Sequence, residues 1–344
     1  MRTSVITRLL GAVLLVVTLS GSALAQEVVL KYSSWLPPSH AANEVFSEWI
    51  ADIERVTDGR VTIEYLPATV RSAREQFDVV TEGLADVVIV VPGFTPGRFP
   101  TLEAGEFPLL VPTNIGTLGP AFNQFYTDEL AASDPFKGAH VLGIMTGLPF
   151  HIATRTGPID TIDKFAGLKL RAPSATGGDI ITAMGGVSVV APGNEVYERA
   201  STGIIDGTFY YFGAMVDWKV GDILPHVAVV PGGMGQSVTA ILVNQSKWDS
   251  LSEADRNAIM TVSGEALVKK LSDKYQADED EALETLQKSP SFKVTNVSDA
   301  FFEELKVRLA PLEAAWAARA KAAGLKDPEG SLARLRESLR AAAN

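Results

Sequence analysis

The sequence predicts an α/β protein made of two units, each with its own sheet. Residues 28–91 alternate strand, helix, strand, helix, strand, and residues 168–209 repeat that order. Several strands are apolar on both faces, as in sheets that helices cover on both sides. The chain has 344 residues, enough for two domains with separate cores.

The first 25 residues predict a cleaved export signal. Arg2 and Arg8 precede an apolar run at 9–19, and the triplet Ala-Leu-Ala at 23–25 is a typical cleavage site. A membrane anchor is the alternative, but this run is too short to cross ~30 Å of hydrocarbon at ~1.5 Å per residue. We expect cleavage after Ala25 and a soluble protein in the periplasm.

Charge and cysteine content exclude several functions. Lys and Arg total 30 against 41 for Asp and Glu, so the formal net charge is −11, or −13 without Arg2 and Arg8. This charge repels phosphate backbones and anionic lipids, so we expect neither a nucleic-acid partner nor binding to membrane surfaces. The absence of cysteine excludes disulfides, thiol nucleophiles, iron–sulfur clusters and Cys-type zinc sites.

The first unit begins with a strand at 28–34. A helix follows from Ser39, with apolar residues at helical spacing up to Gly59, and a second strand covers 61–66. Ser72 and Glu75 have the spacing of a capping box, which opens a helix ending near Gly83 before an apolar strand at 86–91. Ligands of such sheets bind beyond the carboxyl ends of the strands. Those positions are Ser34-Trp35, Pro67-Ala68 and Pro92-Gly93-Phe94.

The second unit has strands at 168–172, 187–190 and 204–209, with helices at 176–184 and 194–201. Its strand ends carry Arg171, Ala191-Pro192 and Phe209-Tyr210-Tyr211. Further strands are predicted at 141–145 and 151–154, between the units, and at 236–244, after the second. The late strand indicates that the chain crosses between the lobes more than once.

The C-terminal part is predicted to be helical. A pattern that Ser252 caps could continue to about Lys288, a length that would brace both lobes unless it breaks near Asp273. Another helical stretch, 299–323, is interrupted by Pro311. The acidic run at 278–281 is interpreted as a solvated helix face, since the alternative, a calcium loop, lacks the glycine that an EF-hand needs.

No motif predicts catalysis. The four histidines, His40, His140, His151 and His226, have no metal-binding spacing, and a nucleophile elbow, a phosphate-binding loop and a dinucleotide fingerprint are all missing. We therefore expect no cofactor and no metal. Paired carboxylates of a glycosidase leave no spacing in sequence, so an exported hydrolase remains the alternative.

Arg171 is the candidate anchor for an anion. A guanidinium in a shielded cleft is a planar fork of donors that matches a carboxylate. The alternative is a structural ion pair with Asp163, Glu195 or another acid.

Seven segments together resemble the periplasmic substrate-binding proteins of tripartite ATP-independent periplasmic (TRAP) transporters, DctP family. They are LKY at 30–32, EGLAD at 82–86, PGRFP at 96–100, TRTGPI at 154–159, GLKLRAP at 167–173, EVY at 195–197 and GIIDG at 203–207. The resemblance covers essentially the whole mature chain. It implies a type II-like, two-lobed binding protein with two mixed sheets flanked by helices, a ligand cleft between the lobes and long C-terminal helices.

The lobes are expected to exchange chain segments. Residues 26–150 with about 236–272 would form lobe I, and 151–235 with about 273–310 would form lobe II. Helices from about 311 to 344 would brace both. The implied function is capture of an organic acid by hinge closure and its delivery to the TRAP membrane permease, by a monomer. A sensor-linked binding protein is a further alternative.

The resemblance also implies roles for particular residues. Arg171 matches the arginine that forms the main salt bridge to the ligand carboxylate, and Arg155 a supporting one. Tyr210, Tyr211 and Trp35 stand where some relatives carry polar side chains, and Phe94 lies at the same sheet edge as Trp35. These aromatic residues favour an organic acid with an apolar or aromatic body. Since neighbours on a strand face opposite ways, at most one of Tyr210 and Tyr211 is expected to touch ligand.

Overall fold

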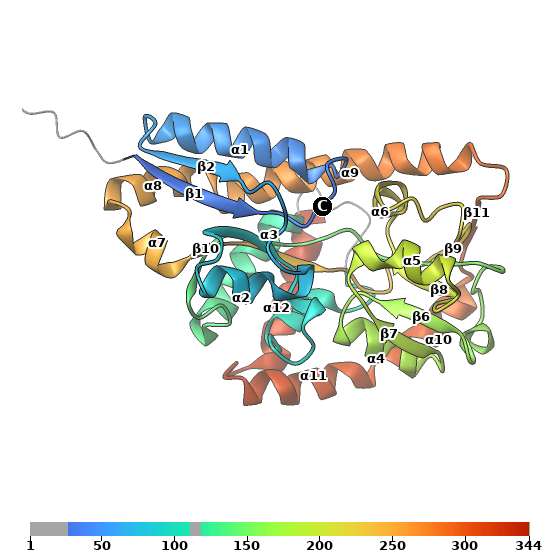
Figure 1. The fold of residues 1–344 in the computed structure, drawn as a ribbon. Helices are drawn as coiled ribbons and strands as arrows, with labels where there is room; N and C mark the ends of the chain where they lie inside the picture. The colour runs from blue at the N-terminus through green and yellow to red at the C-terminus, as the bar shows by residue number, and fades with distance from the viewer. Residues whose placement is uncertain (1–26, 111–117, 344) are drawn as a thin grey trace, which may run out of the picture.

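The computed structural model describes residues 27–110 and 118–343, which form two lobes, each around a mixed sheet (Figure 1). The first sheet has the order β2-β1-β3-β10-β4 and the second β11-β9-β5-β8-β6-β7. The first comprises β1 (Val28–Ser33), β2 (Val61–Tyr65), β3 (Val87–Val90), β4 (Ala139–Thr146) and β10 (Val238–Asn244). The second comprises β5 (His151–Thr154), β6 (Lys169–Ala172), β7 (Val187–Val190), β8 (Gly207–Tyr210), β9 (His226–Val229) and β11 (Lys293–Asn296). The expected export signal lies outside the described residues.

The first sheet confirms the predicted alternation and the late strand. β1 pairs in parallel with β2 and β3, while β10 lies antiparallel between β3 and β4. Helix α1 (Ala42–Val56) packs Phe46, Trp49 and Ile53 against this sheet. The predicted capping box of Ser72 and Glu75 is present and leads into α2 (Gln76–Thr81). The other face is covered by a cluster that includes α3 (Leu118–Phe125), a helix that the sequence did not predict.

α1 starts at Ala42 rather than at Ser39 because the preceding residues form a turn. The backbone N–H of His40 donates to Pro37 O at 2.9 Å, and the Nδ1 atom of His40 accepts the N–H of Ala42 at 3.2 Å. The turn buries the His40 side chain between the lobes, 6% exposed.

In the second sheet, β6 pairs in parallel with β7 and β8, and β5 runs antiparallel between β8 and β9. Its helices are α4 (Ala175–Ala183), α5 (Val196–Ser201) and the unpredicted α6 (Phe212–Asp217). β9 and β11 were also not predicted as strands. β11 is four residues long and mostly exposed, so it carries no apolar alternation.

One long helix joins the lobes. The pattern from Ser252 breaks at Gly264 and not at Asp273, which gives α8 (Glu253–Val262) and α9 (Glu265–Gln287). Gly264 has a φ of +54°, which favours glycine, and its N–H donates to Leu142 O at 2.6 Å. α9 packs on α1 and α3 of the first lobe and on α6 of the second, and Figure 1 shows it running along both.

The acidic run in α9 is only partly solvated. Glu279 turns inward and accepts the N–H groups of Phe212 and Gly213 at 2.9 and 2.8 Å, so it caps the start of α6. Burial raises the pKa of this carboxyl to about 7. The expectation of a fully solvated face was therefore wrong at Glu279, since a neighbouring lobe covers that position.

Three C-terminal helices follow: α10 (Asp299–Leu309), α11 (Pro311–Ala322) and α12 (Pro328–Ala343). Pro311 interrupts the pattern as predicted and becomes the first residue of α11. α10 packs on α4 in the second lobe, and α12 packs on α3 in the first. Arg319 on α11 pairs with Glu103 at 2.7 Å and lies 3.6 Å from Asp179 of α4. The residue limits of the lobes and the bracing role of the C-terminal helices stay predictions.

Candidate ligand-binding site

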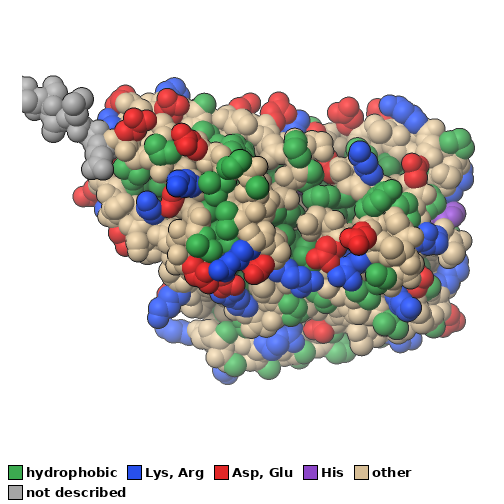
Figure 2. Space-filling view, viewed as in Figure 1, with side chains coloured by type: hydrophobic (Ala, Val, Ile, Leu, Met, Phe, Trp, Pro, Cys, Tyr) green, Lys and Arg blue, Asp and Glu red, His purple; other side chains and the backbone are tan. Residues whose placement is uncertain are grey.

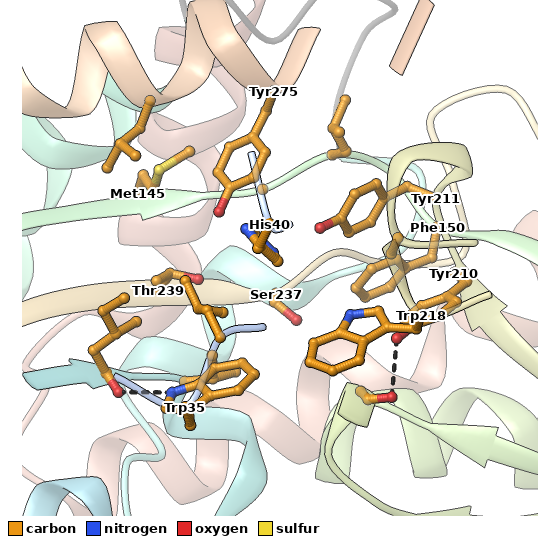
Figure 3. Close-up of a pocket in the computed structure, with 18 of the residues that line it drawn as sticks. Trp35, His40, Met145, Phe150, Tyr210, Tyr211, Trp218, Ser237, Thr239 and Tyr275 are labelled. Carbon is orange, nitrogen blue, oxygen red and sulfur yellow. Dashed lines mark hydrogen bonds between the residues drawn. The ribbon is translucent and has the colours of Figure 1, made fainter. Parts of the chain in front are cut away.

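A cavity of about 90 Å³ lies between the two sheets (Figure 3). By the same measure, one water needs about 10–15 Å³. The lining is mostly apolar and aromatic, and both lobes and α9 contribute to it. Among the lining residues are Trp35, His40, Phe94, Phe150, Arg171, Gly193, Tyr210, Tyr211, Trp218, Ser237, Thr239 and Tyr275.

The first lobe supplies two aromatic rings at neighbouring strand ends. Trp35 follows β1, Phe94 follows β3, and their ring centroids are 5.6 Å apart in an edge-to-face arrangement. The indole Nε1 of Trp35 donates to Ile89 O at 3.1 Å, which fixes the ring beside the cavity. The structure thus brings these two predicted site residues together. Pro67 and Ala68, at the third strand end, do not line the cavity.

Arg171 extends from β6 of the second lobe and is 1% exposed. Its Nε donates to Ala191 O at 2.8 Å and its Nη1 to Phe209 O at 3.2 Å. Among the described residues, Nη2 has no hydrogen-bond partner. Two backbone carbonyls therefore hold the guanidinium in place and leave part of the fork for a ligand.

No carboxylate of the described residues forms an ion pair with Arg171. Glu195, one of the acids considered as a structural partner, pairs instead with Arg199 at 2.5 Å. Burial lowers the pKa of Arg171 to about 10, so the side chain is still protonated at neutral pH. The guanidinium also lies over the ring of Tyr210, at 5.3 Å from its centroid. The site therefore contains a buried cation without a counter-ion from the described residues.

Tyr210 and Tyr211 both line the cavity, although strand alternation predicts that at most one of them touches ligand. Tyr210 is the last residue of β8, whereas Tyr211 occupies the N-cap position of α6. The alternation of side chains along a strand therefore no longer applies to Tyr211. The Tyr210 hydroxyl donates to Gly193 O at 3.0 Å. A side chain at position 193 would lie 2.8 Å from that hydroxyl, so this close approach requires glycine.

Arg155 does not reach the cavity. It follows the end of β5 that pairs with Gly207, whereas Tyr210 pairs with His151 at the other end of the strand. The exposed side chain of Arg155 donates through Nη2 to Ala200 O. The expectation of a second ligand arginine fails here because the strand direction places Arg155 at the opposite sheet edge.

Sequence reasoning missed several lining residues. Phe150 stacks on Tyr211 with centroids 6.2 Å apart, and Trp218 comes from the end of α6. Tyr275 on α9 lies 6.5 Å from Tyr211 and 5.9 Å from His40, centroid to centroid. The sequence offered one indication of these lining residues, namely an aromatic side chain near a predicted strand end or helix break. Only the fold shows that α9 passes over the cleft.

His40 and Asp217 meet across the lobes beside the cavity. Nε2 of His40 lies 3.8 Å from Oδ2 of Asp217 in α6. Burial lowers the pKa of His40 to about 4, so this side chain is neutral at pH 7. Burial, together with Asp278, raises the pKa of Asp217 to about 6.

Within residues 27–110 and 118–343, no three His, Asp or Glu side chains gather as a metal site would require. Charged side chains of both signs are interspersed on the face in Figure 2, so the face has no broad positive patch. No helix among the described residues has the length and apolar character needed to cross a bilayer.

The fold and the site define a two-lobed binding protein with a cavity for a small molecule between the lobes. The chain belongs to the bacterial extracellular solute-binding proteins of family 7, the DctP family, whose model matches residues 32–319. This is a family of TRAP solute-binding receptors, not of enzymes.

Several known proteins are similar to this chain. A TRAP periplasmic solute-binding protein from Bordetella bronchiseptica, solved with (R)- and (S)-mandelate, is 31% identical with a TM-score of 0.86, covering 91% of this chain and 99% of that one. A marine metagenome TRAP protein specific for aromatic acid ligands, solved with 3-hydroxybenzoate, is 25% identical with a TM-score of 0.85, covering 93% and 100%. Outer membrane transporter protein TsaT from Comamonas testosteroni is 26% identical over 92% of this chain and 93% of its own.

Proposed function

We propose that this protein is a periplasmic receptor that binds aromatic carboxylates and delivers them to the membrane permease of a TRAP transporter. One observation carries the proposal: Arg171 is a fully buried cation, unpaired among the described residues, at a cavity with aromatic walls. A buried unpaired charge is costly, and a ligand carboxylate would neutralise it. Each charge-assisted hydrogen bond contributes about 1.5–3 kcal/mol.

The walls favour a flat ring over a flexible chain. The walls contain Trp35 and Phe94, whose rings are in contact, and also Tyr210, Tyr211, Phe150 and Trp218. Aromatic pairs stabilise by about 0.5–1.5 kcal/mol beyond the area they bury. The mandelate and 3-hydroxybenzoate of the two similar structures are both aromatic acids, which supports the same class of ligand for this chain.

Capture would proceed by closure of the lobes around the ligand. The cavity lining comes from both sheets, and His40 and Asp217 approach each other across the cleft. A ligand that contacts both lobes favours the closed form by its differential affinity for that form. Small-angle scattering should therefore give a smaller radius of gyration with saturating ligand than without it.

A thermal-shift screen tests the proposed ligand class. Benzoate, mandelate and 3-hydroxybenzoate should raise the melting temperature, since a ligand at one hundred times its Kd stabilises by about 2.7 kcal/mol. Succinate and the neutral analogue benzyl alcohol should have little effect. Equal stabilisation by succinate would contradict the aromatic preference, and equal stabilisation by benzyl alcohol would contradict the role of Arg171.

A further inference from the structure

The cavity has a single permanently charged residue in its lining. Arg171 is that residue, and among the residues that the structure describes no Asp, Glu or Lys side chain lines the same cavity. One ligand carboxylate therefore satisfies the available cation. A second carboxylate on the same ligand would be buried without a partner, which is costly.

A second cavity, of about 340 Å³, adjoins the first and is acidic. His40, Tyr211 and Tyr275 line both cavities and separate them. The charged residues around the second cavity are Lys274 and the four acids Glu44, Asp217, Asp278 and Glu281. The second cavity, on the far side of these three shared residues, is therefore surrounded by a net negative charge.

Asp217 is the acid placed to act on the ligand cavity. Its side chain is 17% exposed, and no Lys or Arg of the described residues pairs with it. Lys274, the nearby cation, instead contacts Glu44 at 2.8 Å and Asp278 at 3.3 Å. The negative charge of Asp217 thus has no close counter-charge in the described part of the chain.

His40 stands between Asp217 and the cavity without neutralising that charge. Its Nδ1 accepts the N–H of Ala42, so the proton of the neutral ring is on Nε2, which faces Asp217. The field of Asp217 also reaches the cavity walls. Burial is the main cause that raises the pKa values of Tyr210, Tyr211 and Tyr275, and the Asp217 charge raises each of them further.

We propose that the site is selective for aromatic acids with one negative charge, and that Asp217 is the residue that rejects a second one. The inference rests on the proposed function and makes it narrower. Arg171 binds the single carboxylate of the ligand. The far end of the ligand meets neutral side chains, behind which lies the carboxylate of Asp217. A neutral substituent at that end is accepted, whereas a carboxylate is repelled by Asp217 and meets no second cation among the described residues that line the cavity.

Matched ligand pairs separate charge from size. Titration calorimetry at pH 8 would compare terephthalate with 4-carbamoylbenzoate, and isophthalate with 3-carbamoylbenzoate, because each pair differs in charge at nearly constant shape. We expect each amide that binds to bind at least tenfold more tightly than its diacid. Asp217→Asn should reduce that ratio at least threefold by improving the diacid. Asp222→Asn, an exposed acid of the same lobe, should leave the ratio unchanged.

Three results would overturn the inference: equal affinity for acid and amide, a ratio that Asp217→Asn does not alter, or failure of both amides to bind while benzoate does. The last would show that size excludes these ligands. Binding of benzoate distinguishes failure of the selectivity inference from failure of the proposed function. If benzoate and the other aromatic monoacids do not bind at all, the proposed function fails, and the selectivity inference fails with it.

Discussion

The Nη2 atom of Arg74 donates a hydrogen bond to Val190 O at 2.9 Å, which joins the two lobes beside the cavity. Nη1 of the same guanidinium donates to Phe94 O at 3.0 Å within the first lobe. Val190 ends β7 of the second sheet, and Phe94 lines the cavity. Arg74 therefore connects the wall of the ligand cavity to the opposite lobe.

Arg74→Gln should speed ligand release. The variant loses the charged donor that joins the lobes, and such a hydrogen bond contributes about 1.5–3 kcal/mol, or roughly tenfold or more in rate. Stopped-flow displacement of benzoate measures the release rate. Arg71→Gln is the matched control, since Arg71 pairs with Glu82 on its own lobe at 2.7 Å. Equal release rates for the two variants would contradict a role for Arg74 in closure.

Trp35→Ala should weaken binding of aromatic acids more than that of linear acids. The loss of ring contact predicts a decrease of about threefold to tenfold for benzoate, against little change for any binding of butanoate. Calorimetry on both ligands gives the comparison. A similar decrease for both acids would show that Trp35 shapes the lobe without selecting the ring.

Fluorescence offers an independent test of the aromatic walls. Of the five tryptophans, Trp35 and Trp218 line the cavity, whereas Trp248 stacks on His140 away from it, at a centroid distance of 4.1 Å. Changing both Trp35 and Trp218 to Phe should abolish most of the ligand-induced emission change. Trp248→Phe should preserve that change. A full signal in the double variant would place the ligand elsewhere.

The buried carboxyl group of Glu106 should make the free energy of unfolding depend on pH. Burial raises the pKa of this carboxyl from 4.5 to about 8, so the folded protein keeps a proton that the unfolded chain releases. Its contribution to stability is complete below pH 4.5 and is lost as the pH rises through 8. Between these two pH values, this group lowers the free energy of unfolding by at most about 1.4 kcal/mol per pH unit. Denaturant unfolding from pH 6.5 to 8 should show a shallower decline in Glu106→Gln than in wild type, and identical slopes would contradict this.

Local patterns predicted much of the fold. The capping box at Ser72, the break at Pro311 and the late strand that became β10 were all confirmed, because each depends on neighbouring residues or on strand composition. Short elements such as β11 and α6 were missed. Their formation depends on tertiary contacts, as when Glu279 of α9 caps α6.

The site was predictable only where strand order determines position. Trp35 and Phe94 follow strands, Tyr210 ends one and Arg171 is the penultimate residue of another, and the sheet edges bring them together. Tyr275 could not be placed in advance, because its position depends on where α9 breaks and how it crosses both lobes. Arg155 was misplaced because a resemblance in sequence does not fix which end of β5 faces the cleft.

We propose that the Arg171 cation recognises the carboxylate of the ligand. Calorimetric titration of wild type and Arg171→Gln with benzoate and its neutral analogue benzamide tests it most directly, with thermal unfolding run alongside, since the variant also loses hydrogen bonds to Ala191 and Phe209. Wild type should prefer benzoate by at least tenfold, and the folded variant should lose this preference. A folded Arg171→Gln variant that still prefers benzoate as strongly as wild type would contradict it.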